Sequence, residues 1–246
     1  MALETQDLVM QYGSYRALRD VSLVVPDGQY AIIIGENGAG KSTLLRCLAG
    51  WLRPSGGMVT VRGLSIEEHE RTIRQWVKYV PDTPQFYPEL TAWEHVEVVA
   101  RANRQSGDWR ARGLSLLEAF SLDAHRNALP ASFSRGMQYK LAVALSLLAN
   151  PEILLLDEPF GPLDPYSQTY LARRLADLVR NGATVVASTH LLPEGNPPER
   201  VVVLDQGQVA EDGPLTSWWD GETPLSTVPS RLLEEVLTAR RTAADE

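Results

Sequence analysis

Short apolar runs recur along the chain, at residues 30–34, 153–156, 184–188 and 200–204. A continuous apolar run of this length is typical of a strand buried on both faces, as in a parallel sheet covered by helices. Residues 18–25 alternate in a β-like pattern, and 58–61 follow a Gly-Gly turn as a further strand. The pattern predicts an α/β fold with a mixed or parallel sheet and a small N-terminal antiparallel β element.

Helical periodicity dominates the stretch between the first and second of these runs, over 93–104, 109–120 and 137–148. Further helices are expected over 41–49 and 167–179, whereas 81–88, rich in proline and aromatic residues, is expected to be a connecting loop. Because strands flank the helical stretch, we expect one domain over 1–220. Its α/β core covers about 1–85 and 151–220, and an all-helical subdomain is inserted over about 86–150.

Residues 221–246 are predicted to form a C-terminal helical tail. Leu232, Leu233, Val236 and Leu237 make an apolar stripe on a helix over 230–241, and 242–246 are expected to fray. Local packing is the more common use of such a stripe, and a partner-binding helix is the alternative.

Composition is that of a soluble globular protein, with 246 residues, 44% hydrophobic, 22% charged and a net charge of −8. The acidic balance argues against a nucleic-acid partner and against adsorption to anionic lipid. No apolar run is long enough to span a bilayer, and the N-terminus lacks a secretory pattern. The lone Cys47 indicates a reducing compartment and a buried, inert thiol.

A glycine-rich segment follows the apolar run 30–34 and precedes the predicted helix 41–49. It fits G-x-x-x-x-G-K-[ST], a phosphate-binding loop whose backbone N–H groups wrap a polyphosphate at a helix N-terminus. In this pattern the lysine reaches the β- and γ-phosphates and the serine hydroxyl binds Mg²⁺. The predicted nucleotide-binding residues are Gly35, Glu36, Asn37, Gly38, Ala39, Gly40, Lys41, Ser42 and Thr43.

Two carboxylates, Asp157 and Glu158, follow the apolar run 153–156. Asp157 is predicted to anchor Mg²⁺ together with Ser42, since Mg²⁺ binds few carboxylates and keeps several waters. By strand alternation Glu158 is expected to point elsewhere and to act as the general base on the attacking water.

With both motifs present, the chain resembles the nucleotide-binding domain of ABC transporters over residues 8–213. The resemblance implies that Tyr12 stacks on adenine and that His190 contacts the γ-phosphate and orients water beside Glu158. It also implies that Asp164, in Gly-Pro-Leu-Asp, belongs to a loop linking two subunits' sites. Outside this resemblance His190 would be read as structural, like the other histidines. The segment 191–198 holds three prolines and is expected to be a loop.

Two positions depart from the family's commonest pattern. The signature Leu-Ser-Gly-Gly-Gln is here Phe-Ser-Arg-Gly-Met, which retains Ser134 and Gly136, the family's phosphate contacts, but introduces Arg135 and Met137. Ser134 is also a candidate N-cap for the helix that follows. Where the family commonly has glutamine, Asp82 follows Val-Pro and is predicted as a metal-linked residue that acts through water. Both changes resemble ATPases of ABC-2-type exporters.

The resemblance implies an ATP- and Mg²⁺-dependent ATPase, with Glu158, His190 and Lys41 as catalytic residues. It further implies a homo- or heterodimer that closes on ATP and drives an integral membrane permease from the cytoplasmic face, without nucleic acid. One alternative is a non-transport ABC ATPase that regulates a nucleic-acid or ribosomal partner. A second is a binding module without turnover, which the presence of both Glu158 and His190 disfavours.

Overall fold

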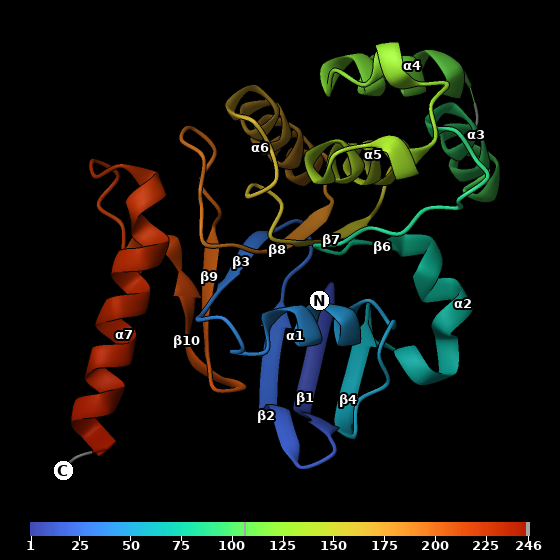
Figure 1. Ribbon diagram of the computed structural model, residues 1–246. Helices are drawn as coiled ribbons and strands as arrows, with labels where there is room; N and C mark the ends of the chain where they lie inside the picture. The colour runs from blue at the N-terminus through green and yellow to red at the C-terminus, as the bar shows by residue number, and fades with distance from the viewer. Residues whose placement is uncertain (106, 245–246) are drawn as a thin grey trace.

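A six-stranded sheet forms the centre of the protein in a computed structural model, which describes residues 1–105 and 107–244. Its order is β10-β9-β3-β8-β7-β6, and only β10 runs antiparallel to its neighbour (Figure 1). The strands are β3 (Tyr30–Ile34), β6 (Val77–Val80), β7 (Ile153–Asp157), β8 (Thr184–Ser188), β9 (Arg200–Asp205) and β10 (Gln208–Pro214). The predicted α/β fold and the four buried strands are confirmed.

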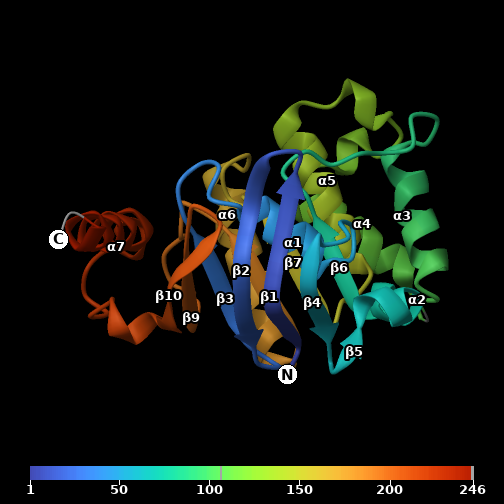
Figure 2. The same ribbon diagram turned by 90° about the horizontal axis from the view of Figure 1, so that it is seen from below.

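A second, antiparallel sheet of four strands stands against the first, in the order β2-β1-β4-β5 (Figure 2). It contains β1 (Leu3–Tyr12), β2 (Tyr15–Val25), β4 (Gly56–Val61) and β5 (Leu64–Ser65). The predicted N-terminal element is therefore present, and larger than the pattern indicated. Strand β1 escaped prediction because its pairing register shifts between Thr5 and Leu8, around Asp7 with φ of 46°. Such an irregularity interrupts the alternation of buried and exposed residues.

Two apolar cores lie on opposite faces of the central sheet. One is shared with the antiparallel sheet and with α1 (Lys41–Leu48), whose leucines are buried against it. The other is covered by α6 (Pro165–Arg180) and by three helices at the top of Figure 1, α3 (Ala92–Ala102), α4 (Trp109–Ala119) and α5 (Arg135–Leu148). Burial of both faces explains why the strands read as continuous apolar runs.

Helices α3, α4, α5 and α6 begin at side-chain caps that satisfy part of their free N–H groups, whereas α1 and α2 (Ile66–Trp76) have no side-chain cap. Thr91 and Glu94 form a reciprocal capping box at the start of α3. Ser134 accepts a hydrogen bond from the N–H of Met137 at 3.3 Å, which confirms its predicted capping role for α5. Helix α2 was not predicted, since only Ile73 of this polar segment is buried. Short 3-10 turns occupy Asp123–His125, Pro130–Ser132, Leu215–Ser217 and Leu225–Thr227.

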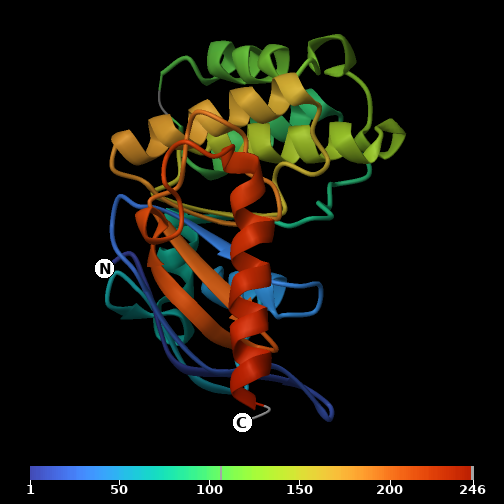
Figure 3. The same ribbon diagram turned by 90° about the vertical axis from the view of Figure 1, so that its left-hand side faces the viewer.

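The tail forms one helix, α7 (Val228–Ala244), that lies along the edge of the molecule beside β9 and β10 (Figure 3). Val228, Leu232 and Val236 are buried in the larger core, so the apolar stripe packs locally as expected. The expected fraying is wrong for 242–244, which are helical, and 245–246 lie outside the described residues. Over the described ranges, none of the helices is both long and apolar enough to cross a membrane.

Candidate active site

The loop between β3 and α1 is held tightly against the rest of the core. Gly40 has φ of 105°, and a Cβ there would lie 2.6 Å from the carbonyl oxygen of Ala17. A Cβ on Gly35 would lie 2.2 Å from the carbonyl oxygen of Leu204. Both positions therefore require glycine. Gly40 is also the N-cap of α1 and provides no side-chain hydrogen bond, so the helix N-terminus presents free N–H groups that suit an anion.

A hollow of about 340 Å³ opens at this loop. The predicted residues that line it come from the end of β1, the loop and the start of α1, the segment after β6 and the end of β7. They are Tyr12, Glu36, Asn37, Gly38, Gly40, Lys41, Ser42, Thr43, Asp82, Asp157 and Glu158. Tyr15 and Ala17 complete the lining. The structure thus brings together in one hollow residues that lie far apart in the sequence, as the motifs predicted.

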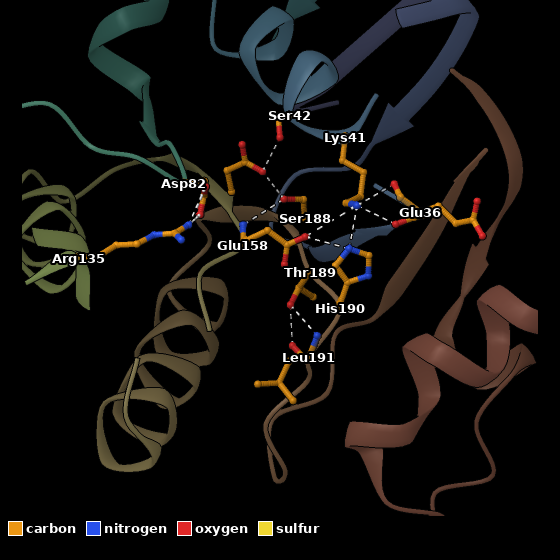
Figure 4. A network of polar contacts seen from close by, with 12 residues as sticks. Glu36, Lys41, Ser42, Asp82, Arg135, Glu158, Ser188, Thr189, His190 and Leu191 are labelled. Carbon is orange, nitrogen blue, oxygen red and sulfur yellow. Dashed lines mark hydrogen bonds and ion pairs between the residues drawn. The ribbon is translucent and has the colours of Figure 1, made fainter. Parts of the chain in front are cut away.

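Lys41 lies at the centre of a polar network (Figure 4). Its ammonium donates to the carbonyl oxygen of Gly35 at 2.7 Å, and lies 3.0 Å from His190 Nε2 and 3.8 Å from Glu158 Oε1. Only 7% of the side chain is exposed. Burial lowers the pKa of Lys41, and the carboxylates of Glu158 and Asp157 oppose that shift. A largely buried ammonium in the same hollow as the uncapped N-terminus of α1 suits a polyphosphate.

Asp157, at the end of β7, is almost fully buried and accepts three hydroxyl hydrogen bonds. Ser188 and Ser42 donate to Oδ1 at 2.6 and 3.0 Å, and Tyr79 donates to Oδ2 at 3.3 Å. The Ser42 hydroxyl and the Asp157 carboxylate form an oxygen pair of the kind that Mg²⁺ prefers. The residues present therefore fit the predicted metal.

Glu158 lies beyond the strand, in a left-handed conformation with φ of 48°. Its N–H donates to the carbonyl oxygen of Ser188 at 3.0 Å and to Ser188 Oγ at 3.1 Å. The carboxylate lies 3.3 Å from His190 Nε2. The side chain of Glu158 therefore points toward Lys41 and His190 because a backbone turn held by Ser188 directs it there. Strand alternation, the reason given from the sequence, is wrong.

Two tyrosines from the antiparallel sheet border the hollow. Tyr12 is 45% exposed, and its ring is accessible for the predicted stacking on a base. Tyr15, on β2, donates its hydroxyl hydrogen to the carbonyl oxygen of Gly38 at 3.1 Å. The sequence contains no motif that singles out Tyr15, and only the pairing of β1 with β2 places it here.

The signature residues lie apart from this hollow. Gly136, in the first turn of α5, borders a neighbouring hollow with Glu158 and His190, whereas Ser134 lines neither. A Cβ on Gly136 would lie 2.8 Å from the carbonyl oxygen of Pro162, so α5 approaches the following loop closely. Within one subunit Gly136 therefore shares a hollow with Asn37 of the phosphate-binding loop, but neither Ser134 nor Gly136 lines the hollow that holds Lys41 and Ser42.

Asp164 is likewise absent from the lining of the loop hollow. It caps α6 by accepting from the N–H and hydroxyl of Ser167, and it pairs with Lys140 of α5 at 2.5 Å. Hydrogen bonds from Lys140 and Ser167 hold the pKa of Asp164 well below its usual value. In this subunit the carboxylate joins α5 to α6.

Asp82 lies at the edge of the loop hollow and contacts Arg135. The Arg135 guanidinium donates to Oδ1 and Oδ2 of Asp82 at 2.7 and 2.9 Å. In the sequence, Asp82 and Arg135 are separate departures from the family's commonest pattern, and nothing there indicates that they are partners.

Three further residues support the site without belonging to a motif. Ser188 and Tyr79 hold Asp157, and Tyr139 of α5 donates its hydroxyl hydrogen to the Asp157 carbonyl oxygen at 3.0 Å. Burial, reinforced by the charge of Asp157, raises the pKa of Tyr79 and of Tyr139. A polar residue at the end of an apolar strand run, like Ser188, was the one available signal.

A phosphate-binding loop between a parallel strand, β3, and a helix, with acidic residues at the end of β7 two places along the same sheet, defines a P-loop nucleoside-triphosphatase. The sequence family described as "ABC transporter" matches residues 18–161. The chain belongs to this family, as an ATP-binding subunit that binds and hydrolyses ATP.

Similar curated proteins include "ABC-type transporter ATP-binding protein EcsA" of Bacillus subtilis (strain 168), 34% identical over 87% of each chain. "Daunorubicin/doxorubicin resistance ATP-binding protein DrrA" of Streptomyces peucetius is 35% identical over 86% of this chain and 65% of that protein. "Glutamine transport ATP-binding protein GlnQ" of Escherichia coli (strain K12) is 31% identical over 96% of this chain and 98% of that protein.

Solved structures share the fold. An ATP-binding subunit of an ABC transporter has a TM-score of 0.86 at 32% identity, and the match covers 96% of this chain and 100% of that chain. A dimeric post-hydrolysis state of the ATP-binding cassette MJ0796, bound to ADP and Pi, has a TM-score of 0.78 at 28% identity. That match covers 87% of this chain and 98% of the other. The predicted family and ATPase activity are confirmed.

Proposed function

We propose that this chain hydrolyses ATP with Mg²⁺ at the loop hollow and that closure of two such subunits powers a membrane exporter. The observation that carries the catalytic part is the group of Lys41, Glu158 and His190, with 3.0 Å between Lys41 and His190 and 3.3 Å between His190 and Glu158. Electrostatic stabilisation by positioned groups is the main source of catalysis in phosphoryl transfer.

The proposed roles follow from these positions. Lys41 and the N–H groups at the start of α1 bind the phosphates and stabilise charge on the transferred group. Glu158 accepts a hydrogen bond from the attacking water, and His190 fixes the direction of that carboxylate. Ser42 and Asp157 would hold Mg²⁺, which supplies charge neutralisation at the phosphate oxygens. Tyr12 offers its ring to the adenine.

Glu158→Gln tests the assignment of the base. The amide keeps the size of the side chain but is a far weaker proton acceptor, so we expect ATP turnover to fall by about 10²- to 10⁴-fold. ATP binding should persist. Glu211→Gln, an exposed change on β10, is the matched control and should leave turnover intact. Equal turnover by both variants would show that Glu158 is not the base.

Dimerisation is supported by the position of the signature residues. Ser134, Gly136 and Asp164 do not line the loop hollow of their own subunit, so a second copy or a related subunit is needed to use them on a nucleotide. We expect Glu158→Gln to form a dimer with ATP on gel filtration and to remain monomeric with ADP. A protein that stays monomeric with ATP at high concentration would contradict the shared site.

Export is proposed from the signature sequence and from the residue at position 82. The Ser-Arg-Gly-Met signature and Asp82 resemble exporter ATPases, and DrrA is named for drug resistance, whereas GlnQ is named for glutamine transport. The partner we propose is an integral membrane permease, contacted from the cytoplasmic face. Co-purification should identify that permease. Reconstitution in vesicles with ATP outside should then show cargo entering the vesicles, and cargo leaving them would indicate import.

A further inference from the structure

Asp82 and Arg135, two of the three residues that depart from the family's commonest pattern, form an ion pair with each other. Arg135 Nη2 lies 2.7 Å from Oδ1 and 2.9 Å from Oδ2 of Asp82 (Figure 4). The residues are 53 positions apart and belong to different parts of the molecule. Asp82 follows β6 of the central sheet, and Arg135 is the first residue of α5.

The electrostatics of α5 explain why the pair forms. A helix N-terminus carries a partial positive charge, which disfavours a cation in the first turn. Arg135 places a cation there, and the first turn of α5 contains no acidic residue. Asp82 supplies the missing negative charge from across the boundary between the two parts.

Asp82 also faces the nucleotide hollow. The described residues that line this hollow include the carboxylates of Glu36, Asp82, Asp157 and Glu158, but only one ammonium, that of Lys41. A nucleotide is itself a polyanion, so a free carboxylate at Asp82 would repel it. The guanidinium of Arg135 offsets that charge. The two side chains are 40% and 67% exposed, so the effect is moderate and is screened by salt.

We propose that Asp82 and Arg135 are positioning residues that work as a unit, in which Arg135 neutralises Asp82 at the edge of the hollow and so favours nucleotide binding. The proposal rests on the role of this chain as an ATP-binding subunit. It gives Asp82 a use different from the predicted link to the metal, and it makes the two sequence changes a compensating pair.

The test measures the dissociation constant of a fluorescent N-methylanthraniloyl ADP at low salt, once with Mg²⁺ and once with EDTA. Arg135→Gln releases Asp82 and should raise the constant about two- to fivefold in both conditions. Asp82→Asn should not raise it, and Asp82→Asn/Arg135→Gln should return it to the wild-type value. Arg135→Lys keeps the charge and should bind as wild type does. High salt should shrink the effect of Arg135→Gln.

Arg101→Gln is the matched control, since it breaks an exposed ion pair with Glu97 within α3 and removes the same charge. It should leave nucleotide affinity unchanged. The proposal is overturned if Arg135→Gln binds as wild type does, or if the double variant stays as weak as Arg135→Gln. Loss of affinity in Asp82→Asn with Mg²⁺ alone would also overturn it and would assign Asp82 to the metal. Wild-type protein that binds no nucleotide would contradict the ATP-binding assignment itself, whereas normal wild-type binding without the predicted pattern would reject only the pair.

Discussion

Replacing Ser188 with alanine isolates a contact that holds both acidic residues of the site. Ser188 is fully buried at the end of β8, and its hydroxyl donates to Asp157 Oδ1 at 2.6 Å. This is the shortest of the three hydroxyl bonds to that carboxylate. The Ser188 hydroxyl oxygen also accepts a hydrogen bond from the N–H of Glu158 at 3.1 Å.

The size of the loss in Ser188→Ala follows from the hydrogen bonds that remain after the hydroxyl is removed. The Glu158 N–H keeps its bond to the Ser188 carbonyl oxygen at 3.0 Å, so no backbone donor is left unpaired. The carboxylate of Asp157 loses one charge-assisted hydrogen bond, which costs about 1.5–3 kcal/mol at a buried site. Because Asp157 then loses its main orienting partner, we expect kcat/KM for ATP to fall about tenfold, with a higher Mg²⁺ requirement.

Thr184→Val is the matched control at the opposite end of β8. It removes a buried hydroxyl that accepts from the N–H of Gly28 at 2.9 Å, far from the loop hollow. Both variants should lose roughly 1–3 kcal/mol in urea unfolding. Only Ser188→Ala should lose activity, assayed by phosphate release at a temperature where both are folded. Equal activity in the two variants would refute the orienting role of Ser188.

Three further outcomes follow from the packing and from the buried groups. Gly38→Ala, at φ of 86° with open space around it, should lose about 1 kcal/mol of stability. Gly40→Ala also places a Cβ 2.6 Å from a backbone oxygen, so its unfolding midpoint should lie at a clearly lower urea concentration than that of Gly38→Ala. Burial raises the pKa of Tyr139, so the unfolded chain deprotonates first, and the stabilisation present below pH ~10 declines above it. The unfolding temperature should therefore fall less steeply with rising alkaline pH in Tyr139→Phe than in the wild type. Tyr166→Phe, which alters an exposed ring, should behave as the wild type does. Leu232→Ala, at a side chain only 1% exposed, should cost about 2–5 kcal/mol in urea unfolding, and a smaller loss would show that α7 packs loosely.

Four of the six strands of the central sheet could be predicted almost to the residue, because burial on both faces leaves an uninterrupted apolar run such as 30–34. The two edge strands, β6 and β10, were not predicted. The phosphate-binding loop could also be predicted, because phosphate binding requires glycines, a lysine and a hydroxyl residue at a fixed spacing along the chain. Local sequence does not encode contacts between distant segments. Asp82 and Arg135 each looked like an isolated change, and the direction of Glu158 depends on a left-handed turn held by Ser188 from another strand.

Helix α5 joins the helical subdomain to the site through three contacts of unequal strength. Arg135 and Lys140 form ion pairs with Asp82 and Asp164, whose carboxylates are 40% and 46% exposed. Tyr139 is fully buried and donates to the Asp157 carbonyl oxygen. Solvent screens the Arg135–Asp82 pair, so it separates at low cost. The Lys140 side chain is only 14% exposed, and breaking the Tyr139 contact would leave a buried carbonyl without its donor, so these two contacts are harder to break. We therefore expect a rotation of the subdomain on the core to break the Arg135–Asp82 pair before it breaks the Tyr139 contact at the end of β7.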